Sequence, residues 1–233
     1  VPLALYQSGW RKGWRHFFKS HELLALIFAA LLTTVAIGAC LGSEGMKFEN
    51  IFIHAPIMAL SAQTTSGFSS LDPSSLDFTS KGVMILAMST GGGVGSTAGG
   101  FKLLRLLILF MILTRCVIRM GMPANAVTSQ KIDGHIIEDA EVQDALLIIL
   151  TFIGVVFLSW LPFLYYGYNP LDALFEVVSA TATVGLSSGI TDASLPTTLK
   201  YVLCADMLFG RLEFIAWMVL LYPRTWFGRK REA

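Results

Sequence analysis

Two long stretches without any charged residue limit the fold of this chain more than any other feature. Residues 23–41 and 145–166 are apolar and contain no Asp, Glu, Lys or Arg. A helix of about 20 apolar residues crosses a hydrocarbon core about 30 Å thick. Only 14% of the 233 residues are charged, whereas a soluble domain carries about 25%. The sequence therefore predicts an all-α integral membrane protein that crosses the bilayer several times.

A ten-residue pattern occurs twice, 118 positions apart. Residues 61–70 read SAQTTSGFSS and residues 179–188 read SATATVGLSS, with six of the ten positions identical. Each copy follows a long apolar run and then a short apolar segment, which is too short to cross a bilayer and is a re-entrant candidate. Another long apolar run comes after each copy. Internal repeats of this kind predict two copies of one helix, short helix, loop and helix unit.

The apolar run after the first copy is too long for one spanning helix. Residues 80–118 would form a helix of about 58 Å at 1.5 Å per residue, roughly twice the hydrocarbon thickness. A glycine cluster at residues 91–100 lies in its middle, and glycine disfavours helix. Non-helical backbone at membrane depth survives only inside protein or beside a water-filled cavity. We expect a broken helix whose loop lines a pathway.

The glycine cluster also partly matches two phosphate-binding patterns. Gly93 to Ala98 fits a dinucleotide fingerprint, but the next acidic residue is Asp133, far beyond the spacing of about 20 residues that such a fold needs. Gly95 to Gly100 has P-loop spacing, but Phe101 stands where lysine belongs. We therefore expect no nucleotide site and no organic cofactor. Since no nucleophile–base pair or carboxylate pair is visible, we expect no enzyme.

Basic residues gather in three segments that fix the orientation. Residues 11–19, 115–131 and 224–231 hold eleven of the 17 Lys and Arg, while the loops of the opposite face hold Lys47, Lys81 and Lys200. The positive-inside rule places the linker and both ends in the cytoplasm, so the duplicated motifs enter from outside. We expect a basic and aromatic cytoplasmic segment at 1–20, a first unit with a broken second helix at 21–120, a cytoplasmic linker at 121–140, a second unit at 141–228 and a cytoplasmic tail at 229–233.

The duplicated motif is small, hydroxylated and free of charge. Such a stretch suits a line of backbone carbonyls that replace the hydration shell of an ion, with glycine permitting backbone angles closed to other residues. The short helix before each copy would aim its negative dipole end at a cation, and Thr65 and Thr183 would add hydroxyl oxygens. A packing turn of small residues is the alternative, and the pattern alone leaves both open.

Four stretches give the chain a resemblance to a known family: residues 64–68 (TTSGF), 95–102 (GSTAGGFK), 179–186 (SATATVGL) and 210–213 (GRLE). They resemble the Trk/Ktr/HKT superfamily of cation transporters, above all its bacterial TrkH/TrkG potassium-uptake type. The resemblance implies repeats three and four of a K⁺-channel-like pore of four membrane helix–pore helix–filter loop–membrane helix repeats. It covers the chain from about residue 10 onward, with Ser66 where many relatives have alanine. Two repeats are absent, and the chain begins with valine, so we expect a piece of a longer pore.

The resemblance also implies residue roles. The selectivity filter corresponds to Thr64, Thr65, Ser66, Gly67, Phe68, Thr183, Val184, Gly185 and Leu186, with K⁺ held at Thr65, Ser66, Gly67, Thr183, Val184 and Gly185. The gate corresponds to Gly91, Gly92, Gly93, Gly95, Ser96, Thr97, Ala98, Gly99, Gly100, Lys102 and Arg211. K⁺ is the only cofactor implied.

The partners follow from the same resemblance. It implies a homodimer in the bacterial inner membrane, surrounded by lipid, with a cytosolic nucleotide-binding regulatory subunit of the TrkA type docked on residues 115–144 and the C-terminus. The missing repeats one and two come from the same parent chain or from a second chain. No nucleic acid is expected.

Several alternatives stay open. An ion-coupled secondary transporter or a non-conducting membrane scaffold would also show repeats and broken helices, although coupled transporters usually carry charges near the midplane. Arg211 either gates the path or forms a buried ion pair with Asp206 or Glu213. Lys102 either contacts the gate or reaches to the cytoplasmic interface. Asp172 and Glu176 are expected to anchor the short helix rather than bind ions, and His54 is expected to pack.

Overall fold

The computed structural model describes residues 21–93, 96, 98–120, 131–132, 135–136 and 139–211, and it is helical apart from two short strands. The segment 1–20, the tail 229–233, most of the linker, Gly95, Thr97 and Glu213 lie outside the described residues. The elements are α3 (His21–Ser43), α4 (Phe48–Thr64), the 3₁₀ turn η1 (Pro73–Ser75), α5 (Phe78–Thr90), α6 (Leu103–Met120), β1 (Lys131–Ile132), β2 (His135–Ile136), α7 (Asp139–Tyr165), α8 (Pro170–Thr181) and α9 (Thr197–Arg211).

The same order of elements occurs in both halves. A long helix, a shorter helix, a loop and another helix follow one another as α3, α4 and α5, and again as α7, α8 and α9. Within the described part of the chain, residues 22–43 and 140–165 are long and apolar enough to cross a membrane. The 17 residues of α4 and the 12 residues of α8 are shorter, as the sequence predicts. The only strands described, β1 and β2, pair in antiparallel fashion within the expected linker.

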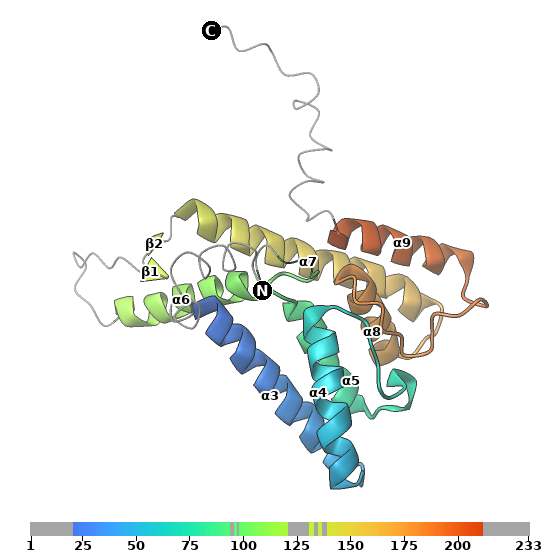
Figure 1. Cartoon of the computed structure of the whole chain (residues 1–233). Helices are drawn as coiled ribbons and strands as arrows, with labels where there is room; N and C mark the ends of the chain where they lie inside the picture. The colour runs from blue at the N-terminus through green and yellow to red at the C-terminus, as the bar shows by residue number, and fades with distance from the viewer. Residues whose placement is uncertain are drawn as a thin grey trace, which may run out of the picture.

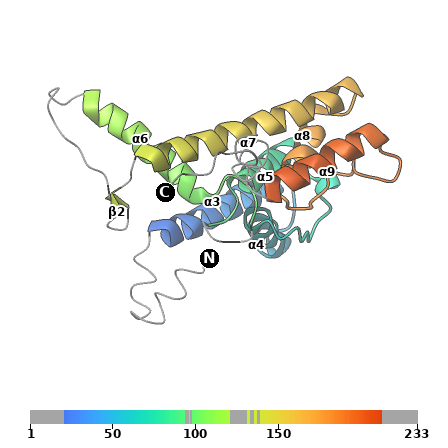
Figure 2. The ribbon, with the colours of Figure 1, turned by 90° about the horizontal axis from the view of Figure 1, so that it is seen from above.

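The predicted break in the long apolar run is confirmed. Helix α5 ends at Thr90, α6 begins at Leu103, and residues 91–102, here called the glycine loop, connect them. The end of the loop folds back on α5, since the Phe101 amide donates to the Ser89 carbonyl at 3.1 Å. Figure 2 shows α6 leading away from α5 toward the side of the molecule where α7 begins.

Helix α8 lies at the centre of the packing. It contacts α5 from the first half as well as α7 and α9 from its own half, while α4 lies against α3 and α5 (Figure 1). Phe175 of α8 is fully buried, together with Met84 of α5, Phe163 of α7 and Leu199 of α9. One shared core therefore joins the two halves.

The outer faces of the long helices are apolar and exposed. Phe28 and Val35 on α3 are 67% and 69% exposed, and Leu150 and Leu158 on α7 are 67% and 66% exposed. A soluble monomer rarely shows large apolar patches of this kind. Exposed apolar faces on two helices long enough to cross a membrane agree with the membrane prediction.

Candidate ion-binding site

Helix α4 ends in a tight left-handed turn that starts the first twin loop (residues 65–70). Thr65 has φ 54°, and the Ser66 amide donates to the Ser61 carbonyl at 3.1 Å. This is the Schellman arrangement, in which the last carbonyls of a helix are satisfied by the residues that leave it. Gly67 then takes φ 76°. A left-handed angle at threonine is uncommon and costs energy, so the surrounding structure holds it there.

Helix α8 ends in the same way at the second twin loop (residues 183–188). Thr183 has φ 53° and Gly185 has φ 87°, and the Val184 amide donates to the Ser179 carbonyl at 2.8 Å. Every one of these positions lies 118 residues after its counterpart in the first loop. The repeated sequence therefore produces a repeated backbone, with the same left-handed threonine and the same left-handed glycine.

The two twin loops touch each other through their backbones. A side-chain carbon at Gly67 would collide with the Val184 carbonyl oxygen, so only glycine allows this approach. At Gly185 no atom blocks an added carbon, and the left-handed φ is the constraint instead. The two glycines are thus required for different physical reasons. Phe68, next to Gly67, is 74% exposed on the described surface.

The glycine loop lies against both twin loops. The Gly99 amide donates to the Thr65 hydroxyl oxygen at 3.3 Å. An added carbon at Gly99 would collide with the Ala182 carbonyl and would come within 2.7 Å of the Thr183 hydroxyl oxygen. Gly99 therefore fills the space between the two halves at the ends of α4 and α8, where no side chain fits.

Two cavities border the glycine loop. One of about 140 Å³ brings Lys102 and Arg211 together with Thr183. Its other lining residues are Ser96, Ala98, Gly99, Gly100 and Gly210. A second cavity of about 390 Å³ is lined by Gly92, Gly93, Ser96 and Ala98 of the loop and by α3 and α4, including Gln63 and Thr64. The structure thus gathers the described gate candidates in these two cavities, near the C-terminal ends of α4 and α8, except Gly91, which packs against Gly99.

The two basic residues of the smaller cavity come from different halves. Lys102 is 8% exposed and has φ 64°, a third left-handed residue that is not glycine. Arg211 ends the described part of α9. Asp206, one predicted partner of Arg211, instead accepts a hydrogen bond from the Ser159 hydroxyl at 2.6 Å. Asp206 thus has a different partner in the described structure, and Glu213, the other predicted partner of Arg211, lies outside the described residues. The choice between a gating and an ion-pairing role for Arg211 stays a prediction.

Gly210, beside Arg211, packs directly on the end of α8. A side-chain carbon there would collide with the Thr181 carbonyl. We expect Gly210→Ala to lower the free energy of unfolding by about 1–3 kcal/mol, as overpacking does. Gly154→Ala in α7 is the control, because an added carbon there meets nothing within 4 Å. Thermal unfolding of the detergent-purified protein that contains this chain measures both; equal melting temperatures for the two variants would contradict the close contact.

Two lysines that the sequence interpretation put in outer loops lie in helices instead: Lys200 in α9 and Lys81 in α5. Lys81 is 7% exposed. Its ammonium group forms an ion pair with Asp172 of α8 at 2.7 Å. The partners are 91 residues apart, and no spacing rule links them. Asp172 and Glu176 do anchor α8, as predicted, since each is bonded to a neighbouring segment.

These features together, long helices with exposed apolar faces and an uncharged, glycine-bearing loop after each short helix, are typical of helical membrane transport proteins. Residues 23–225 match the family described as TrkH, cation transport protein. The chain therefore belongs to the TrkH cation transport family, and the resemblance seen in its motifs is confirmed. The relatives below are named as transporters and uptake proteins rather than enzymes.

Three relatives show the extent of the similarity. The chain is 30% identical over 199 residues to an uncharacterized cation transporter of Methanocaldococcus jannaschii, covering 84% of this chain and 41% of that one. It is 28% identical over 233 residues to the Trk system potassium uptake protein TrkH of Halomonas elongata, covering 96% and 47%. The crystal structure of the potassium transporter TrkH from Vibrio parahaemolyticus shares the fold, with a TM-score of 0.84 at 24% identity over 97% of this chain and 50% of that one. The chain thus spans about half of the proteins that it matches.

Proposed function

We propose that this chain forms two repeats of a K⁺ uptake pore, with α4 and α8 as pore helices and the twin loops as two strands of the selectivity filter. The observation that supports this most is the matched backbone of the twin loops. Left-handed angles at both Thr65 and Thr183, and again at Gly67 and Gly185, turn the chain in the same way at equivalent points of the two repeats.

The chemistry of the twin loops suits K⁺. Filters of K⁺ channels bind the ion by replacing its hydration shell with backbone carbonyl oxygens. Residues 65–67 and 183–185 carry no charge, and each set contributes carbonyls and one threonine hydroxyl. The dipoles of α4 and α8 place partial negative charge at the C-terminal ends of these helices, next to the twin-loop residues. This charge favours a cation there.

The glycine loop and Arg211 are proposed as the gate. The loop lies against the inner ends of both filter strands, where it would obstruct the path. A guanidinium group has five N–H donors for carbonyl oxygens, and its charge repels an arriving cation, most strongly where the dielectric is low. Lys102 faces the same cavity and adds a second positive charge.

The complete transporter needs the other half of the pore, supplied by the same parent chain or by a second chain. We further propose, from the family, a homodimer in the bacterial inner membrane with the linker and C-terminus in the cytoplasm, and a nucleotide-binding regulatory subunit of the TrkA type. The basic segments 115–131 and 224–231 support this orientation through the positive-inside rule.

The direct test is ion flux through the complete transporter, meaning this chain together with the other half of its pore. Reconstituted in liposomes, it should take up K⁺ and discriminate against Na⁺ at equal gradients. Flux that depends on an opposing or accompanying H⁺ or Na⁺ gradient would favour an ion-coupled transporter. An absence of any flux from correctly folded protein would favour a scaffold.

The chain by itself should not conduct selectively. It supplies two filter strands, so the carbonyls of the twin loops would lack half of their surroundings, and each unsatisfied backbone group in lipid costs several kcal/mol. We expect purified chain in planar bilayers to associate or lose structure. A K⁺-selective current from this chain alone would contradict the two-repeat assignment.

A further inference from the structure

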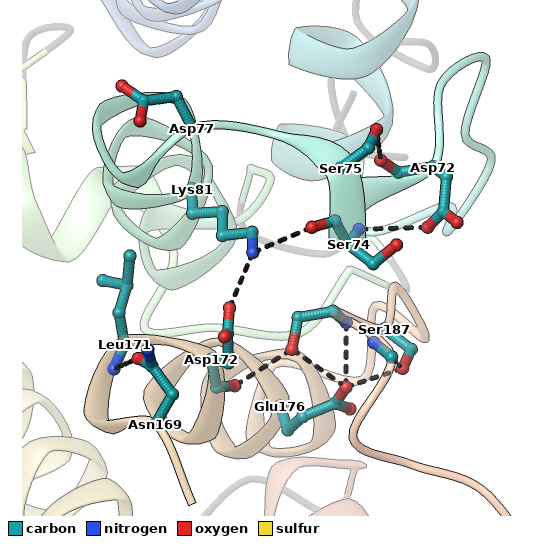
Figure 3. A network of polar contacts seen from close by, with 12 residues as sticks. Asp72, Ser74, Ser75, Asp77, Lys81, Asn169, Leu171, Asp172, Glu176 and Ser187 are labelled. Carbon is teal, nitrogen blue, oxygen red and sulfur yellow. Dashed lines mark hydrogen bonds and ion pairs between the residues drawn. The ribbon is translucent and has the colours of Figure 1, made fainter.

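The segment that leaves the second twin loop is tied to α8 by one buried carboxylate. Glu176 is 4% exposed and accepts four hydrogen bonds; Figure 3 shows those made by Oε1. Its Oε1 accepts from the Ser187 hydroxyl at 2.6 Å and from the Ser188 amide and hydroxyl at 2.8 and 3.2 Å. Its Oε2 accepts from the Thr191 hydroxyl at 2.6 Å. A buried carboxylate with so many donors is held in one geometry.

The same face of α8 is tied to the first repeat. Asp172 lies one turn before Glu176, and its carboxylate binds Lys81 of α5 at 2.7 Å. The Lys81 ammonium group also donates to the Ser74 carbonyl in η1 at 3.2 Å, and Figure 3 shows it between these two acceptors. The Ser74 amide in turn donates to Asp72 at 3.0 Å, which lowers the pKa of that carboxyl. A continuous polar network thus runs from the first repeat, through α8, to the second loop.

Among the described residues, the first repeat has no carboxylate at the position equivalent to Glu176. The repeat offset of 118 residues places Met58 where the second repeat has Glu176, and His54 where it has Asp172. Met58 is 1% exposed and apolar. The counterpart of Ser188 is Ser70, whose hydroxyl is buried and finds no hydrogen-bond partner among the described residues. The two repeats therefore match in backbone but differ in what holds the chain after the loop.

We infer that Glu176 is a positioning residue that makes the second twin loop the rigid, selectivity-setting wall of the pore. The inference rests on the proposed function. Na⁺ is smaller than K⁺, so a filter that can contract around Na⁺ loses its preference. Four hydrogen bonds to residues 187–191 limit any inward movement of the Val184 and Gly185 carbonyls just before them. Because Gly67 abuts the Val184 carbonyl, the fixed second twin loop also limits the movement of the first twin loop.

The test compares K⁺ and Na⁺ flux, per folded molecule, in the complete transporter. Glu176→Ala should lower the K⁺/Na⁺ flux ratio about fivefold or more, because all four hydrogen bonds to a charged acceptor are lost, while K⁺ flux itself changes little. Glu176→Gln keeps an oxygen that can accept the three hydrogen bonds made at Oε1, so it should retain most of the wild-type K⁺/Na⁺ flux ratio. Thr191→Val removes one donor with little change of shape and should lower the ratio by a smaller factor.

Met58→Ala is the matched control. It shortens the buried side chain at the equivalent position of α4 without removing any polar anchor, so it should reduce thermal stability and leave the flux ratio unchanged. A similar fall of the ratio in Met58→Ala and Glu176→Ala would show that packing, rather than the anchor, is responsible.

The outcomes separate this inference from the proposed function. A wild-type transporter without K⁺ preference would overturn the proposed function. If the wild type prefers K⁺ and Gly185→Ser abolishes that preference, but Glu176→Ala and Thr191→Val leave it unchanged, the inference alone fails. Should Glu176→Ala not fold, the ratio in Thr191→Val decides.

Discussion

Replacing Gly67 or Gly185 by serine should reduce K⁺ over Na⁺ selectivity about tenfold in the complete transporter. A left-handed backbone costs a residue with a side chain about 1–2 kcal/mol, and 1.4 kcal/mol corresponds to about a tenfold ratio. Gly67→Ser should have the larger effect, because its added carbon also collides with the Val184 carbonyl, whereas Gly185→Ser meets open space. K⁺ and Na⁺ fluxes in liposomes at matched protein content measure the change.

Gly167→Ser is the control for backbone strain alone. Gly167 has φ 83°, close to that of Gly67 and Gly185 in the twin loops, and an added carbon there meets nothing within 4 Å. It lies in the connection between α7 and α8, outside the twin loops. The Gly167→Ser variant should lose thermal stability but keep its K⁺ over Na⁺ selectivity. If neither filter variant differs from Gly167→Ser in its flux ratio, the twin loops are not the filter.

Arg211→Ala should raise the basal K⁺ leak of the complete transporter, also by about tenfold. The substitution removes hydrogen-bond donors and a positive charge from the cavity shared with the glycine loop and Thr183. The loss of either one favours the open path by a free energy similar to that of a hydrogen bond to a charged group, about 1.5–3 kcal/mol. Arg211→Lys keeps the charge but has fewer donors, and should give an intermediate leak. Flux per correctly folded molecule, without any regulatory ligand, is the measurement.

Lys200→Ala separates local from general charge effects. Lys200 lies on the same helix about three turns from Arg211 and donates to the Ala193 carbonyl at 2.7 Å, away from the cavity. Its removal lowers the net charge by the same amount and should leave the leak unchanged. Equal or lower flux in Arg211→Ala at equal folding would rule out the gate as described.

Local patterns in the sequence predict most of the helices. Charge-free runs of 19 and 22 residues indicate α3 and α7, because hydropathy is a property of neighbouring residues. Glycine clustering predicts the break between α5 and α6 for the same reason. The repeat offset correctly pairs Thr65 with Thr183, whose φ angles differ by one degree.

Long-range packing is what the sequence does not reveal. Lys81 resembles an outer-loop lysine until the structure places Asp172 beside it. The repeat offset, which matches backbones well, also conceals the difference between Met58 and Glu176, because similar helices tolerate either residue. Contacts such as Gly99 between Thr65 and Ala182 join residues whose separation along the chain carries no periodic signal.

The Gly99 amide donates to the Thr65 hydroxyl oxygen, which the proposed filter would also offer to K⁺. If K⁺ in the filter draws on that hydroxyl oxygen, ion occupancy and attachment of the glycine loop compete for the same lone pairs. Linkage then requires reciprocity: if attachment of the loop lowers the K⁺ affinity by some factor, bound K⁺ lowers the equilibrium constant for loop attachment by the same factor. External K⁺ would thus act on its own gate, and permeation and gating could not be tuned independently at this residue.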